Sequence, residues 1–271
     1  MKLSVMMIVF NTESILPKNM LTLCIENILP FSDNIVIVEG ATKAANGHYF
    51  DGCTDSFTKD GRSTDGTIDV LKNLEKQYPE IKVIIGNGYW PGKTIMCNAA
   101  VPFFKNDYLL QLDSDEFYHH KDMESIIRVL ENDKPDSVHF YANHFVGGFD
   151  KVIDETNGQK WGNDIPWMRI FKHIPGVSRW MRHEPPTYKP LGYDIISKDR
   201  TLSMGIKMFH YSYVVESQFQ FKDKFFNNPE YMNSWKRYKE TGEMEIFGIK
   251  PKPFIGEHPD IIKRYYKEIL W

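Results

Sequence analysis

Short apolar runs alternate with amphipathic stretches along the first half of the chain. The runs are short and rich in β-branched residues, and they are apolar throughout, which is typical of strands buried on both faces. Between them, apolar residues recur three or four positions apart, as on one side of an amphipathic helix. The pattern predicts strands at 3–10, 34–39, 81–86 and 108–112 and helices at 16–30, 63–78 and 93–104.

Alternating strands and helices indicate the α/β class, with a mostly parallel central sheet and helices on both faces. The second half is less regular and predicts strands at 136–150, 167–173 and 205–214 and helices at 121–133, 215–240 and 259–270. No linker, repeat or low-complexity tract interrupts the chain. We therefore expect a single domain over 1–271, with a regular half at 1–118 and a less regular half at 119–271.

Composition and charge narrow the class of protein. With 42% apolar residues, 25% charged residues and a net charge of -3, the chain is that of a folded protein without a nucleic-acid partner. Three widely spaced cysteines fit neither a disulfide framework nor a zinc motif, which favours a reducing cytoplasm. Residues 1–14 lack a signal-peptide pattern, and no apolar run is long enough to span a bilayer, so we expect no membrane anchor.

The sequence LLQLDSDEFY, at 109–118, places three carboxylates directly after a buried strand. Asp113 and Asp115 share one face of an extended segment, and Ser114 points to the other. Ligands of parallel sheets bind beyond the carboxyl ends of the strands. Two carboxylates at that edge suit a divalent cation that also keeps phosphate oxygens as ligands. The alternative is a solvated acidic turn, and Glu116 is either a further ligand or an outward-facing acid before the next helix.

Further polar residues fall at the same predicted edge. Phe10, Asn11 and Glu13 follow the first strand, and Glu39 ends the second. Other sites that use acidic or glycine-rich turns are excluded. An EF-hand loop needs Gly where Tyr118 stands, and the chain has neither a P-loop nor a G-x-S-x-G motif.

The ordered set of motifs resembles glycosyltransferase family 2, whose members have the GT-A nucleotide-sugar fold. Over 3–118 the resemblance is carried by the opening strand, V-E at 38–39, S-T-D-G-T at 63–67, N-A-A at 98–100 and L-D-S-D-E at 112–116. Later, R-I-F-K-H at 169–173, R-H-E-P-P at 182–186 and F-H-Y-S-Y at 209–213 are similar to a bacterial branch of the family. The resemblance implies transfer of a sugar from a nucleoside-diphosphate sugar, with a UDP-sugar favoured, to an acceptor hydroxyl. It also implies inversion at the sugar and assistance by Mn²⁺ or Mg²⁺.

The leaving diphosphate of such a reaction gains charge, which a bound cation would neutralise. Asp115 is the expected metal ligand, and Asp113 would bind the ribose or reach the metal through water. The family pattern of a late histidine in the metal shell suggests His210, for which a buried core imidazole is the alternative. His183 is the competing ligand.

The nucleotide-sugar must also be held. By position and by resemblance, the expected donor-binding residues are Phe10, Asn11, Glu13, Glu39, Asp65, Lys93, Asp113 and Ser114. Each has an ordinary alternative, namely turn chemistry and helix capping for the first three, a first-turn acid for Asp65, and a solvated side chain for Lys93. Asn98 carries over from the family only weakly.

The acceptor hydroxyl must lose a proton to a general base. Glu184 in RWMRHEPP matches the H-E of the resembling branch, where the acid takes the place of the catalytic base, so we expect Glu184 to be catalytic. A salt bridge to Arg179 or Arg182 is the alternative.

Two further features stay open. The family usually runs the second-strand acid straight into the S-T-D-G-T turn, whereas 23 residues separate Glu39 from Ser63 here. The segment 40–62 is either a lid over the donor or a surface insertion. The aromatic residues of the second half either pack on sugar rings or fill the core, and they are Trp161, Trp167, Trp180 and Tyr188.

Two other functions compete with glycosyl transfer. A nucleotidyltransferase acting on sugar phosphates shares the sheet and the acidic site, but it carries a Gly-rich basic loop after the first strand, which FNTESILPK lacks. A nucleotide- or glycan-binding protein that kept the fold without turnover is the third hypothesis.

Overall fold

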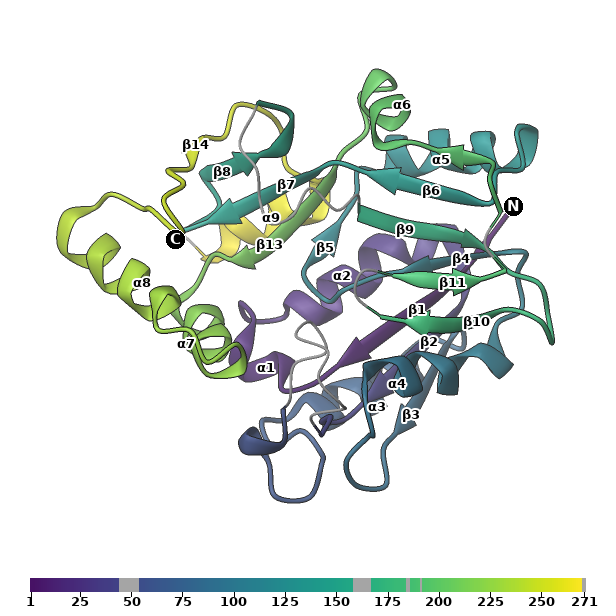
Figure 1. The fold of residues 1–271 in the computed structure, drawn as a ribbon, viewed down its shortest axis with the longest axis horizontal. Coiled ribbons are helices and arrows are strands. Elements are labelled where there is room, and N and C mark those ends of the chain that lie inside the picture. The colour runs from purple at the N-terminus through teal and green to yellow at the C-terminus, as the bar shows by residue number, and fades with distance from the viewer. Residues whose placement is uncertain (44–53, 158–166, 184–185, 191, 270–271) are drawn as a thin grey trace.

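The computed structural model describes residues 1–43, 54–157, 167–183, 186–190 and 192–269, and two β-sheets form its centre (Figure 1). Among these residues, the larger sheet has seven strands, which are, in spatial order, β12 (Ile195–Ile196), β6 (Ser137–Phe140), β9 (Trp167–Lys172), β4 (Tyr108–Gln111), β1 (Leu3–Val9), β2 (Ser32–Glu39) and β3 (Ile81–Ile85). The smaller described sheet contains β14 (Lys252–Pro253), β8 (Lys151–Asp154), β7 (Ala142–Val146), β13 (Met208–Tyr213) and β5 (Glu116–Phe117). A separate hairpin is formed by β10 (Arg179–Arg182) and β11 (Thr187–Lys189).

The larger sheet is mostly parallel, as the sequence predicts. β1 pairs in parallel with β2 and with β4, and β2 pairs in parallel with β3. β9 is the antiparallel member, lying between β4 and β6. Because neighbouring parallel strands end at one edge, the segments that follow β1, β2 and β4 come together there.

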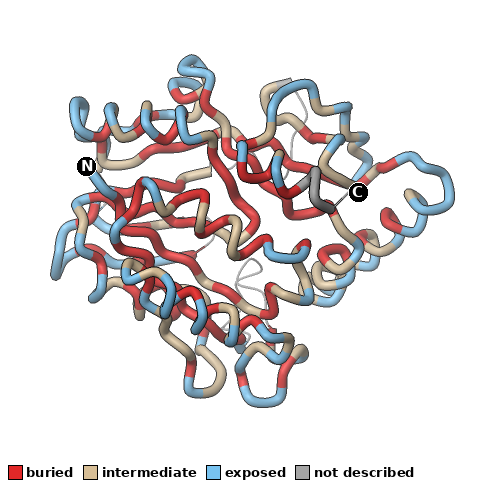
Figure 2. Tube along the Cα trace, turned by 180° about the vertical axis from the view of Figure 1, so that it is seen from behind, coloured by how far each residue is buried: buried red, intermediate tan, exposed pale blue. Residues whose placement is uncertain are grey.

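Helices cover both faces of the larger sheet. The described helices are α1 (Thr12–Ile15), α2 (Met20–Ile28), α3 (Thr67–Gln77), α4 (Lys93–Ala100), α5 (His120–Asn132), α6 (Lys198–Ser203), α7 (Glu216–Phe225), α8 (Glu230–Thr241) and α9 (Asp260–Ile269). In β1, Val5 and Met7 face the core formed with α2 and α3, whereas Met6 faces the core formed with α4. Figure 2 shows the resulting pattern, with buried strands at the centre and helices exposed on their outer sides.

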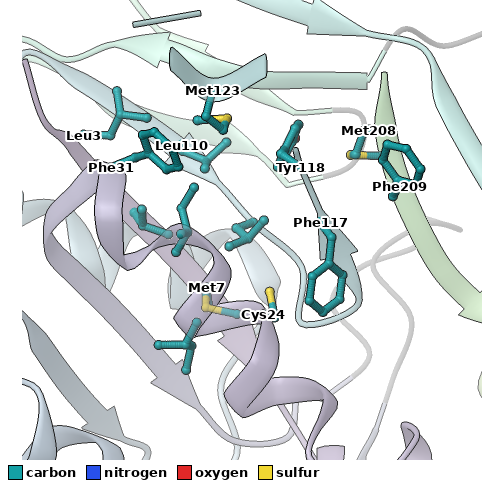
Figure 3. Close-up of a cluster of buried hydrophobic side chains, with 14 of the residues drawn as sticks. Leu3, Met7, Cys24, Phe31, Leu110, Phe117, Tyr118, Met123, Met208 and Phe209 are labelled. Atoms are coloured by element: carbon teal, nitrogen blue, oxygen red, sulfur yellow. The ribbon is translucent and has the colours of Figure 1, made fainter. Parts of the chain in front are cut away.

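One hydrophobic cluster joins the two sheets (Figure 3). It combines Leu3 and Leu110 of the larger sheet with Phe117 and Met208 of the smaller one, and Cys24 of α2 lies among them. The two sheets therefore share a continuous core.

The predicted elements of the first half are confirmed, with changes at their ends. The predicted helix at 16–30 begins at Met20, after a turn that contains Pro17 and the left-handed Asn19 (φ 62°). The prediction of a single strand at 136–150 is wrong. The chain leaves the larger sheet after Phe140 and enters the smaller one at Ala142, so two strands replace one. The helix predicted at 215–240 is likewise two helices, α7 and α8.

Cys24 and Cys97 are buried, and Cys53 lies outside the described residues. Within the described part of the chain, no helix has the length and apolarity needed to cross a membrane.

Candidate active site

A cleft of about 540 Å³ opens beyond the carboxyl ends of β1, β2 and β4. The smaller sheet and α7 form its other walls, and Ser217 of α7 anchors that helix by donating a hydrogen bond to the Ile15 carbonyl (2.7 Å). Of the expected donor-binding residues and metal ligands, six line the cleft, namely Phe10, Lys93, Asp113, Ser114, Asp115 and His210.

Arg169 of β9 separates the roles of the three acids after β4. Its guanidinium is fully buried and donates from Nε to both carboxylate oxygens of Glu116 (3.1 and 3.0 Å) and from a terminal nitrogen to Asp113 (3.1 Å). Burial raises the pKa of Glu116, and the charge of Arg169 opposes this shift. Burial opposes ionisation of Asp113 too, but the charge of Arg169 and of further cations outweighs it, so the pKa of Asp113 is lowered. Glu116 is therefore a buried partner of Arg169, and the outward-facing alternative is wrong.

Asp115 faces a different set of groups. Its Oδ1 lies 3.7 Å from Nε2 of His210 in β13, and its side chain is hydrogen-bonded to Ser212. Burial, helped by the charge of Asp113, raises the pKa of Asp115 to about 6, against the opposing charge of Lys222. Burial also lowers the pKa of His210 well below its ordinary value. His210 is thus a neutral imidazole, the form that can bind a metal.

Asp115 and His210 fit a divalent cation as a pair of ligands. A carboxylate oxygen and an imidazole nitrogen 3.7 Å apart can both approach one ion to about 2.2 Å. The part of the chain that the structure describes contains no group of three His, Cys, Asp or Glu side chains arranged to hold a metal. The chain therefore offers two ligands here, and such an ion would need phosphate oxygens or water for the rest.

Two lysines bring positive charge to the same cleft. Lys93 begins α4, and its Nζ lies 5.1 Å from the centre of the Phe225 ring of α7. Lys222 of α7 lies 4.6 Å above the ring of Tyr213. Burial lowers the pKa of Lys222, with a smaller contribution from Lys93 and against the charges of Asp115 and Asp113. Both lysines line the same cleft as Asp113 and Asp115.

Three of the predicted donor-binding residues form hydrogen bonds with backbone amides of nearby loops. Asn11 has a left-handed backbone (φ 48°), and its side-chain oxygen accepts a hydrogen bond from the Thr64 amide (2.9 Å). Asp65 accepts from the Ser14 amide (2.7 Å), and Glu39 accepts from the Ser63 amide (2.7 Å).

None of Asn11, Glu13, Glu39 and Asp65 lies in the described wall of the cleft. Burial raises the pKa of Glu13, helped by Asp65, and burial raises the pKa of Glu39. Oε2 of Glu39 is buried and has no hydrogen-bond partner among the described residues.

Glu184, the predicted base, lies outside the described residues, but its neighbours His183 and Pro186 line the cleft. His183 is buried, its Nε2 lies 3.4 Å from the Gln111 amide nitrogen, and burial lowers its pKa to about 3. The neutral imidazole of His183 is therefore part of the cleft wall. Of the segment 40–62, residues 44–53 are not described, whereas Gly40, Thr42 and Thr54 line the cleft.

The aromatic residues of the second half lie in different parts of the fold. Trp167 lines the cleft, with the Arg169 guanidinium 4.9 Å from its ring centre. Trp180 and Tyr188 are buried against one another (4.8 Å between ring centres) in the core next to α4. Asn98 holds this hairpin in place by exchanging two hydrogen bonds with the Trp180 backbone (both 2.9 Å). Trp161 lies outside the described residues.

The sequence does not predict several residues in and behind the site. Arg169 lies in a segment with a recognisable motif, but nothing local predicts its pairing with Glu116. Lys222 belongs to a helix without any motif. His144 and Glu155, which lie behind His210, become neighbours only through the pairing of β7 with β13 and with β8. The signal for all four is long-range strand pairing or helix packing.

Comparison with known proteins gives a family. The model of glycosyl transferase family 2 matches residues 57–214. Among solved structures, S. aureus TarS 1-349 in complex with UDP-GlcNAc is similar at 17% identity, covering 61% of this chain and 38% of that one, with a TM-score of 0.37. The mannosyltransferase PcManGT from Pyrobaculum calidifontis, in complex with GDP-Man and Mn²⁺, is similar at 13% identity, covering 63% and 44%, with a TM-score of 0.39.

This chain spans less than half the length of those two structures. No curated protein matches it. The match to the family model, in contrast, runs from the segment before α3 to the end of β13 and includes every acid of the cleft discussed above. Because this match extends over more than half of its residues, the chain belongs to glycosyl transferase family 2.

Proposed function

We propose that this protein transfers a sugar from a nucleoside-diphosphate sugar, preferably a UDP-sugar, to an acceptor hydroxyl with inversion at the anomeric carbon. The observation that carries the proposal is the meeting of Asp115, His210, Lys93 and Lys222 in one cleft at the carboxyl edge of the sheet. This mixture of two metal-ligand types and two ammonium groups suits a diphosphate that gains negative charge as it leaves.

The acidic and basic residues have complementary roles in this proposal. Asp115 and His210 would hold Mn²⁺ or Mg²⁺, which neutralises the diphosphate. Lys93 and Lys222 add positive charge from α4 and α7. Asp113, which accepts a hydrogen bond from Arg169, would also accept one from a ribose hydroxyl or from a metal-bound water. Phe10 offers an aromatic wall for the base.

The acceptor side is assigned to Glu184 and Trp167. Glu184 lies in the chain between two residues of the cleft wall, and a carboxylate there would take the proton from the acceptor hydroxyl. Direct attack by that hydroxyl on the anomeric carbon inverts its configuration. The Trp167 ring provides an apolar surface for a sugar face.

Incubation with a panel of nucleotide-sugars, with and without Mn²⁺, tests the proposal. Release of nucleoside diphosphate together with a glycosylated acceptor supports it, and NMR of the product reports the anomeric configuration. Pyrophosphate exchange with sugar phosphates supports a nucleotidyltransferase instead. Binding of the donor without turnover on any acceptor supports a non-catalytic binding protein.

Two variants separate the assigned roles. Asp115→Ala is expected to abolish the Mn²⁺-dependent part of the thermal stabilisation by UDP, and the exposed Asp150→Ala serves as control. Glu184→Gln is expected to keep UDP binding and to lose transfer by at least 10²-fold, the usual contribution of a general base. An active Glu184→Gln enzyme would place the base elsewhere.

A further inference from the structure

A chain of four side chains runs from the cleft into the smaller sheet, and three of them are buried. It begins with Asp115, whose Oδ1 is 3.7 Å from Nε2 of His210. Nδ1 of His210 lies 2.9 Å from Nδ1 of His144, and Nε2 of His144 lies 3.3 Å from Oε1 of Glu155. His144 is fully buried.

The fold itself builds this chain of contacts. β7 and β13 are parallel neighbours, and their register sets His144 directly opposite His210. Trp167 of β9 packs against both imidazoles, with 5.3 Å between its ring centre and each of theirs. The two imidazoles are themselves 5.1 Å apart at 71°. The rings therefore have defined orientations.

The hydrogen-bond partners fix the direction of this chain. A carboxylate can only accept, and Glu155 also accepts from Nε1 of Trp167 (3.3 Å) and from the Ala142 amide (3.1 Å). Nε2 of His144 must therefore carry a proton and donate it to Glu155. With that proton on Nε2, the singly protonated form of His144 has its lone pair on Nδ1.

The hydrogen bond between His144 and His210 sets the tautomer of His210 in the same way. Two nitrogens 2.9 Å apart share one proton, so Nδ1 of His210 carries it and donates to Nδ1 of His144. Nε2 of His210 is left with a lone pair that faces the Asp115 carboxylate. Two electron-pair donors that face each other across 3.7 Å form a pair of ligands for a positive ion.

We propose that Glu155 and His144 are positioning residues that lock His210 into its Nδ1–H tautomer, so that Nε2 and Asp115 together bind a divalent cation. The inference rests on the proposed function for the role of that cation. A carboxylate or imidazole behind a metal-binding histidine commonly sets its tautomer and orientation and raises its basicity as a ligand.

Histidine ¹⁵N NMR of the metal-free chain tests the tautomers directly. We expect His210 to be protonated at Nδ1 and bare at Nε2, and His144 to show the reverse. Spectra of His210→Gln and His144→Asn assign the signals. A proton on Nε2 of His210 would overturn the inference, whatever the enzyme does with nucleotide-sugars.

Manganese binding gives a second measurement that does not depend on turnover. His144→Phe removes both nitrogens and is expected to weaken Mn²⁺ binding in the presence of UDP by 10- to 100-fold, measured by electron paramagnetic resonance. His144→Asn keeps an acceptor near the position of Nδ1 and should bind Mn²⁺ at least several-fold more tightly than His144→Phe. His139→Phe, which replaces another buried histidine on β6, is the control.

Unchanged Mn²⁺ affinity in a folded His144→Phe, or no Mn²⁺ binding by the unaltered chain, would refute the inference. If His144→Phe does not fold, the tautomers that ¹⁵N NMR reports for the unaltered chain still test the inference. Failure of glycosyl transfer alone refutes only the proposed function, because the tautomers and the Mn²⁺ affinity are measured without an acceptor.

Discussion

Arg169 determines which acid after β4 faces His210. Its buried guanidinium holds Glu116 and Asp113, so Asp115 is the carboxylate that faces His210. Without Arg169, three carboxylates within four positions would repel one another in a buried site. A single cation on the neighbouring antiparallel strand therefore gives similar acids different roles.

Replacement of Arg169 tests this view of the acids. Arg169→Met keeps most of the side-chain volume but leaves Glu116 buried without its charged partner. We expect the free energy of unfolding to fall by about 3–5 kcal/mol, the usual cost of removing one partner of a buried ion pair. Urea denaturation measures this loss. Arg179→Met, on an exposed position of β10, should change stability by less than about 0.5 kcal/mol. A loss below about 1 kcal/mol in Arg169→Met would contradict the assigned role.

Lys222 is expected to bind phosphate oxygens. Lys222→Met should weaken UDP binding by about tenfold, which corresponds to about 1.4 kcal/mol and is within the range of one charge-assisted hydrogen bond. Uridine binding should not change, because uridine has no phosphate. Isothermal titration calorimetry measures both. Lys224→Met, two residues further along α7 and exposed, is the matched control. Equal losses for UDP and uridine would show that Lys222 supports the cleft and does not contact phosphate.

Single residues could be predicted only where a local pattern reveals their surroundings. Asp113 and Asp115 follow a strand whose apolar run marks it as buried, and the structure brings both to the cleft. In Asn11 and Asp65, in contrast, side-chain oxygens accept hydrogen bonds from loop amides. No local pattern predicts that His144 will contact His210, because they lie 66 positions apart in the chain and only strand register brings them together.

At the scale of elements, burial on both faces made the parallel strands predictable. β1, β2 and β4 are apolar runs because a helical layer covers each of their faces. The two-residue strands β5, β12 and β14 have no such pattern, since so few residues cannot show a period. The sequence also does not predict that the chain changes sheet between β6 and β7, because both strands are buried and only one residue separates them.

The start of α5 should make the stability of the fold depend on pH. Burial raises the pKa of Asp122, in the first turn of α5, to about 6. The folded chain therefore binds more protons than the unfolded chain between about pH 4 and 6, so the free energy of unfolding falls as pH rises through that window. Asp122→Asn cannot ionise and escapes this loss. Its stability relative to the unaltered chain should rise by about 1–3 kcal/mol from pH 4 to pH 7 and then stay constant.

Urea denaturation across this pH range measures the effect. Asp69→Asn is the matched control, because Asp69 occupies the corresponding position in the first turn of α3 and is exposed. Its stability difference should not follow the same pH dependence. A pH-independent difference for Asp122→Asn would indicate altered helix capping and not the burial of a charge.

At the scale of the whole molecule, the chain passes repeatedly between its two sheets. β4 lies in the larger sheet and β5 in the smaller one, and the chain then returns to the larger sheet at β6 before it enters the smaller one at β7. The sequence predicts one domain from the absence of linkers, but it does not show this interleaving. The cleft depends on it, because Asp115 follows the larger sheet while His210 belongs to the smaller one.

We predict that the two sheets unfold together, because a continuous hydrophobic cluster joins them. Phe145→Ala tests this in the smaller sheet, where the ring of Phe145 stacks 4.5 Å from that of Tyr211. The loss of a buried Phe should lower the free energy of unfolding by about 3–5 kcal/mol. Far-ultraviolet circular dichroism and tryptophan fluorescence, to which Trp180 next to the larger sheet contributes, should report one coincident transition shifted by the same amount. If two separate transitions appeared, the sheets would be independent units, and the cleft between them would have to assemble from two separately stable parts.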